Sequence, residues 1–79
     1  MTRTAHWVEL TGRVATECRA IDGDFIFKLD VGGQLVNVIL KNRKRGVKVN
    51  DKLVIEGFLI DGNLLGYKCK PVRIPIRDL

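Results

Sequence analysis

The stretch Val8-Glu9-Leu10-Thr11-Gly12-Arg13-Val14 decides the fold, because it alternates apolar or small residues with polar ones over seven positions. Successive side chains of a β-strand point to opposite faces, so this alternation predicts a strand with one buried face. Trp7 then lies on the opposite, polar face. A glycine inside a strand often marks a bend, so we expect the strand over residues 7–14 to bend at Gly12.

Four further segments have the same period of two or a short continuous apolar run, and they cover residues 24–31, 34–41, 52–60 and 64–74. Turn-forming pairs such as Asp22-Gly23, Asn50-Asp51 and Asp61-Gly62 separate the segments. Gly32-Gly33 predicts a two-residue hairpin between the second and third strands. Pro71 has no N–H group for a ladder, so it should interrupt the fifth strand or lie at a sheet edge.

The segment 42–51 is basic, short and rich in valine, and we expect a loop there rather than a stable helix. Five strands without a substantial helix can close into a small barrel that has few open edges. The sequence therefore predicts an all-β, five-stranded antiparallel barrel of the OB-fold type, with an SH3-like barrel as the alternative. One domain spans residues 1–79, with flexible ends over 1–5 and 75–79.

The composition suits a polyanionic partner, and it equally suits a domain whose charge only keeps it soluble. The 79 residues include 14 Lys and Arg against 9 Asp and Glu, which gives a net charge of +5. Small basic domains commonly bind nucleic acids or other polyanions. No stretch approaches the roughly 18 apolar residues of a membrane span, and the first residues lack the apolar core of a signal peptide. We therefore expect a cytoplasmic protein that does not contact the membrane.

Catalytic and metal-binding patterns are missing from the sequence. Cys18 and Cys69 are too far apart for a C-x-x-C pair, and His6 is the only histidine. A general base needs a positioned partner and a substrate pocket, and the carboxylates are scattered over turns. We expect reduced thiols, no metal, no cofactor and no enzymatic activity.

Two segments resemble known OB-fold families. The stretch from Val8 to Val14 and the later stretch Asn50-Asp51-Lys52-Leu53-Val54-Ile55-Glu56-Gly57-Phe58-Leu59 resemble the first and fourth strands of bacterial single-stranded-DNA-binding proteins and of primosomal replication protein N. The long hairpin, glycine-rich linker and acidic tip typical of the first family have no counterpart here. This resemblance implies binding of single-stranded DNA and a role in DNA replication.

A second resemblance points to RNA. The stretch Arg43-Lys44-Arg45-Gly46-Val47-Lys48-Val49-Asn50-Asp51-Lys52-Leu53-Val54-Ile55 is similar to part of bacterial translation initiation factor one, a basic OB barrel that binds ribosomal RNA. The alternative function is therefore an RNA- or ribosome-binding module. Of the two nucleic acids, the resemblances favour DNA.

OB barrels bind single strands through aromatic rings that stack on bases and through basic grooves that follow phosphates. The densest run of charge places five cations within eight residues, from Lys41 to Lys48. The residues expected to bind nucleic acid are Trp7, Arg13, Lys28, Asn37, Lys41, Arg43, Lys44, Arg45, Lys48, Tyr67, Lys68 and Lys70. For Trp7, packing in a subunit interface is the alternative to stacking.

A third hypothesis is a small homo-oligomeric interaction domain with surfaces at Trp7, Ile26, Ile39 and Phe58. The two last strands also offer more apolar side chains than one small core can cover, and surplus apolar surface usually meets a partner. We expect Val54, Phe58, Ile60 and Leu64 to be exposed and to mediate a homodimer.

Overall fold

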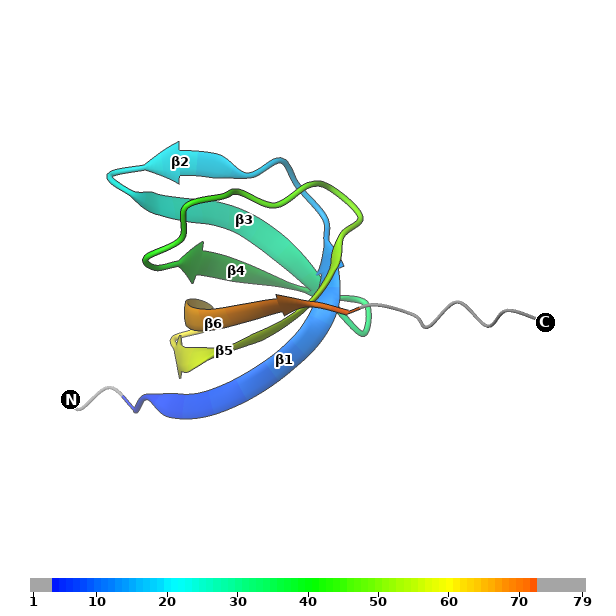
Figure 1. The fold of residues 1–79 in the computed structure, drawn as a ribbon. Coiled ribbons are helices and arrows are strands. Elements are labelled where there is room, and N and C mark those ends of the chain that lie inside the picture. Colours follow the sequence, from blue (N-terminus) through cyan, green and yellow to red (C-terminus); the bar gives the residue numbers. More distant parts are fainter. Residues whose placement is uncertain (1–3, 73–79) are drawn as a thin grey trace.

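Six strands follow one another along residues 4–72, which are the residues that the structure, a computed structural model, describes (Figure 1). They are β1 (His6–Val14), β2 (Arg19–Ile21), β3 (Asp24–Val31), β4 (Gln34–Leu40), β5 (Lys52–Ile60) and β6 (Asn63–Pro71). The five long strands confirm the predicted segments, and Pro71 is the last residue of β6. The predicted end of the fifth strand at residue 74 and the flexible end at 75–79 lie outside the described residues.

Five of these strands close into a barrel in the order β1-β5-β6-β4-β3, and β1 pairs with β3 at Arg13 and Val14 to complete the ring. The long connection after β4 crosses to β5, which is not its neighbour, and β6 returns between them (Figure 1). This Greek-key order is consistent with an OB-fold-like barrel. Residues 4–72 contain no helix, so the segment 42–51 is a loop as predicted. The described residues therefore include no helix that could span a membrane.

One pairing differs from the antiparallel arrangement that we expected: β4 and β6 run parallel, with Val38 opposite Leu64. The reason is geometric. Five strands in a closed barrel cannot all be antiparallel to both of their neighbours, because strict alternation of direction requires an even number of strands. The closed barrel therefore requires a parallel pair somewhere, and the crossing connection places it between β4 and β6.

The core is built from the inward positions of the alternating strands. Its eight buried side chains are Val14, Phe27, Leu29, Val38, Leu40, Leu53, Ile55 and Leu64. Gly12 lies where β1 meets β3, and a Cβ atom there would collide with the carbonyl of Asp30. A Cβ atom at Gly57 would likewise collide with the carbonyl of Leu65. The glycine predicted at the bend of the first strand thus permits close contact between two strands.

The sequence analysis missed β2. Asp22 and Gly23 both have positive φ angles, 50° and 83°, which form the tight turn that joins β2 to β3. Gly32 and Gly33 also have positive φ angles, and they form the predicted hairpin between β3 and β4. The strand β2 extends the barrel wall beyond β3 and borders the site described below.

A β-bulge changes which residues of β6 point outward. Gly57 pairs with Gly66 and Glu56 pairs with Lys68, so Tyr67 is the extra residue and its side chain is exposed. Leu64, opposite Leu59, is fully buried. The prediction that Leu64 is exposed is therefore wrong, because this residue occupies an inward position of β6.

Candidate nucleic-acid interface

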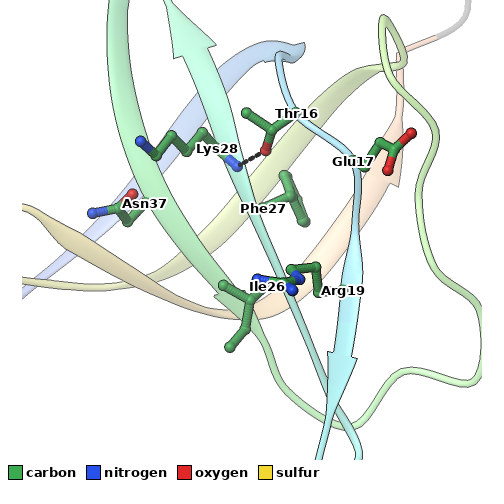
Figure 2. Close-up of a pocket in the computed structure, with 7 residues that line it drawn as sticks. All are labelled: Thr16, Glu17, Arg19, Ile26, Phe27, Lys28 and Asn37. Carbon is green, nitrogen blue, oxygen red and sulfur yellow. Dashed lines mark hydrogen bonds between the residues drawn. The ribbon is translucent and has the colours of Figure 1, made fainter.

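A groove of about 570 Å³ lies over β3 and β4, beside the segment that follows β1 (Figure 2). Three elements supply its walls: the segment 15–18 with β2, the middle of β3, and Asn37 of β4. The lining residues are Thr16, Glu17, Arg19, Ile26, Phe27, Lys28 and Asn37. Concave sites with an apolar lining and a few polar groups are typical ligand sites.

Two hydrogen bonds fix the wall that follows β1. The backbone N–H of Lys28 donates to Thr16 Oγ1 over 2.9 Å, as Figure 2 shows. The backbone N–H of Ala15 donates to the carbonyl of Lys28 over 2.8 Å. Both the N–H and the carbonyl of Lys28 are thus bound to residues 15–16, so this wall is held against the middle of β3.

The groove combines an apolar floor with cations at its sides. Ile26 pairs with Ile39 across β3 and β4, and both side chains are half-buried. Lys28 pairs with Asn37 further along the ladder, and Arg19 of β2 pairs with Ile26. Ammonium and guanidinium groups can bind phosphates, while an amide can bind a base edge. Glu17 is the one carboxylate among the lining residues.

The basic loop, residues 41–51, begins with two cations that the protein itself binds. Lys41 Nζ lies 2.8 Å from Asp24 Oδ2, and this hydrogen-bonded ion pair raises the pKa of Lys41. The half-buried Arg43 donates from Nε to the carbonyl of Arg45 over 3.2 Å and from Nη1 to the carbonyl of Cys69 over 3.3 Å. These contacts hold the start of the loop against β3 and β6.

The next three cations are free to meet a ligand. Lys44, Arg45 and Lys48 are exposed, and within residues 4–72 their side chains have neither a hydrogen bond nor an ion pair. The loop also lies beside the groove, since a Cβ atom at Gly46 would be 3.4 Å from Cys18 Sγ. The basic loop therefore passes next to the segment 15–18, which forms one wall of the groove.

The other predicted residues lie elsewhere on the barrel. Arg13 Nη1 donates to the carbonyl of Asn50 over 3.3 Å at the end of β1. Trp7 and Tyr67 lie together on the outer face of β1, β5 and β6, and the exposed Lys68 and Lys70 project from β6. One row of paired residues crosses the neighbouring strands, in which each residue pairs with the next: Ile26, Ile39, Leu65, Phe58 and Trp7. At about 4.8 Å per strand, these four steps place Trp7 roughly 19 Å around the barrel from the groove.

The structure thus does not bring the twelve predicted residues together on one surface. The groove and the basic loop bring together Lys28, Asn37, Lys41, Arg43, Lys44, Arg45 and Lys48. Sequence reasoning missed Thr16, Arg19 and Ile26, which line the groove. Arg19 lies in a strand too short for periodicity to identify, but the Asp22-Gly23 pair, a strong hairpin signal, could have located it.

The thiols offer no second site. Cys18 and Cys69 are free and half-buried. Burial raises the pKa of Cys69, although the charge of nearby Arg43 opposes this effect. Among the described residues, no three His, Cys, Asp or Glu side chains are grouped closely enough to hold a metal ion.

No protein-family model matches this chain, and comparisons with curated proteins and with solved structures return no significant match. The groove, its charges and the barrel topology therefore carry the functional argument.

Proposed function

We propose that this protein binds single-stranded nucleic acid, and single-stranded DNA in preference to RNA, without catalysing a reaction. The observation that carries the proposal is the position of the basic loop, with its free cations, next to the segment that walls the groove over β3 and β4. The equivalent strand face of OB-fold barrels commonly binds oligonucleotides or oligosaccharides. A shared fold does not establish a shared function, so the chemistry of the site decides between these ligands.

The charge of the site favours a nucleic acid over a sugar. Arg19 and Lys28 flank the groove, and the nearby basic loop carries the exposed Lys44, Arg45 and Lys48. A neutral sugar would gain little from this charge, whereas a phosphate backbone releases condensed counterions when it binds cations. The half-buried Ile26 and Ile39 between the charged side chains offer bases an apolar surface.

The shape of the site favours a single strand. The half-buried apolar floor can contact bases only if they are unpaired, because bases in a duplex stack on one another. The preference for DNA rests on the resemblance of residues 8–14 and 50–59 to single-stranded-DNA-binding proteins. RNA is the alternative, supported by the resemblance of the basic loop to initiation factor one.

The proposal is tested by replacing the groove residues Lys28 and Asn37 together with Ala. A labelled oligo-dT of about 15 nucleotides covers the upper range of OB-fold site sizes. We expect fluorescence anisotropy to show weaker binding by about tenfold or more, because a phosphate contact and a base contact are lost together. Lys70→Ala is the matched control, since Lys70 is exposed on β6. Equal affinities of the two variants would contradict a binding site in this groove.

A further inference from the structure

Three aromatic side chains, Trp7, Phe58 and Tyr67, form an exposed cluster on the outer face of β1, β5 and β6, here called the aromatic patch. Their exposed fractions are 49%, 38% and 47%. The rings of Trp7 and Phe58 meet edge to face with centroids 4.9 Å apart, and Tyr67 lies 6.2 Å from both. The rings thus contact one another instead of dispersing over the surface.

The backbone explains why these rings meet. Trp7 and Phe58 are direct partners across β1 and β5, so their side chains project from the same face of the sheet. The bulge in β6 turns Tyr67 outward beside them. Half-buried Leu65 continues the row on β6. A cluster of this kind on a small domain marks an interaction surface.

Charged residues of both signs border the aromatic patch. In the adjacent row, Glu9 pairs with Glu56 and Glu56 pairs with Lys68. Two like charges directly opposite each other destabilise a strand pair. Lys68 Nζ is 4.0 Å from Glu56 Oε2, and Glu9 has no ion pair among the described residues. The face therefore presents an unneutralised carboxylate on one outer strand and an exposed ammonium on the other.

We propose that the aromatic patch binds a second copy of this chain in a twofold-symmetric dimer. A twofold axis that lies between the two faces, parallel to the central strand β5, places β1 of one copy opposite β6 of the other, because these strands flank β5 on opposite sides. Residues of one row then meet: Glu9 faces Lys68 of the second copy, and Trp7 faces Leu65 of the second copy, with Tyr67 beside it. The face is thus complementary to itself at Glu9 and Lys68 and along its apolar row.

The composition of the patch also suits a protein partner better than a nucleic acid. Tryptophan, tyrosine and phenylalanine are enriched at the centres of protein interfaces, which are surrounded by a polar rim. The carboxylates of Glu9 and Glu56 would repel phosphates next to the rings. The groove lies on other strands, so a dimer of this kind leaves it open in both copies.

The size of the face sets the strength of the dimer. Nine-residue strands are about 30 Å long, and three strands span about 14 Å, so the face covers roughly 400 Å². Stable interfaces bury about 800 Å² per partner. The face is thus about half the size of a stable interface, so we expect a weak dimer.

Sedimentation velocity from about 5 to 500 µM tests this dimer. We expect the sedimentation coefficient of the parent to rise with concentration and that of Phe58→Ser to stay at the monomer value. Leu35→Ser is the matched control, because Leu35 is 55% exposed on β4, outside the patch, and it should dimerise like the parent. A parent that stays monomeric, or equal behaviour of the two variants, overturns the proposal.

A charge exchange tests the symmetry without removing an aromatic ring. Glu9→Lys should weaken the dimer, because the new ammonium group would face that of Lys68 in the second copy, and adding Lys68→Glu should restore it. Failure of the double variant to restore dimerisation overturns the proposed geometry. The fluorescence of Trp7, the only tryptophan, separates this inference from the proposed function. Quenching of that fluorescence by oligo-dT at monomer concentrations, together with weaker oligonucleotide binding by Phe58→Ser, would reassign the patch to nucleic acid.

Discussion

Lys41 Nζ lies 2.8 Å from Asp24 Oδ2, so the first cation of the basic loop is bound by a carboxylate of the protein itself. This carboxylate already neutralises the charge of Lys41, so a phosphate would gain little from it. We therefore predict that Lys41→Ala leaves the salt dependence of oligo-dT binding nearly unchanged, as measured by anisotropy at several salt concentrations. A slope that flattens as much as that of Lys44→Ala would show that Lys41 binds phosphate despite Asp24.

Lys44 and Arg45 have no such partner among the described residues, and they should bind phosphates directly. Each phosphate contact on a single strand contributes about 0.7 to the slope of log K against log salt. The double variant Lys44→Ala/Arg45→Ala should therefore flatten the slope by about 1.4 and weaken binding similarly for all sequences. Lys52→Ala, an exposed cation on β5, is the control. An unchanged slope in the double variant would remove the basic loop from the interface.

Leu64 is fully buried on β6, whereas Leu35 is 55% exposed on β4. Leu64→Ala should lower the free energy of unfolding by about 2–5 kcal/mol, because it removes core contacts and leaves a cavity. Leu35→Ala should change this free energy by less than about 0.5 kcal/mol. Urea unfolding followed by circular dichroism measures both. Similar losses in the two variants would place Leu64 outside the core.

Cys69 should make the stability of the protein fall at alkaline pH. Burial raises the pKa of its thiol, so the folded state favours the protonated form more than the unfolded state does. Its contribution is complete below the ordinary thiol pKa and is lost as the pH rises through the raised value of the folded state. We predict that the Tm of the parent falls more steeply above about pH 8.5 than that of Cys69→Ala. Parallel Tm profiles between neutral and alkaline pH would contradict this assignment.

Much of the barrel could be predicted because the alternation of side chains is local. The inward positions of the first strand, from Val8 to Val14, and the Gly32-Gly33 hairpin follow directly from neighbouring residues. That alternation does not encode strand direction. The parallel pairing of β4 with β6 follows only from the closure of a barrel with an odd number of strands. The exposure of Tyr67 depends on a bulge, which shifts one strand against its partner without an unambiguous sequence signal.

The site was predictable only in part for the same reason. The run of cations from Lys41 to Lys48 is visible in the sequence. The sequence does not show which of these cations the protein itself binds and which are free. Arg43 binds the carbonyl of Cys69, a residue 26 positions away, and only the fold brings the two together. The groove forms where the segment after β1 lies against Lys28 of β3, and that contact is also non-local.

Binding of the parent protein to labelled oligo-dT, oligo-U and duplex DNA at about 50 and 200 mM salt tests whether the groove binds single strands. We expect anisotropy to rise with oligo-dT at the lower salt, oligo-U to bind more weakly and the duplex more weakly still, and all binding to decrease at the higher salt. Tighter binding of oligo-U would favour the RNA alternative. No binding of either single strand at the lower salt, or tighter binding of the duplex, would contradict a groove built for single strands.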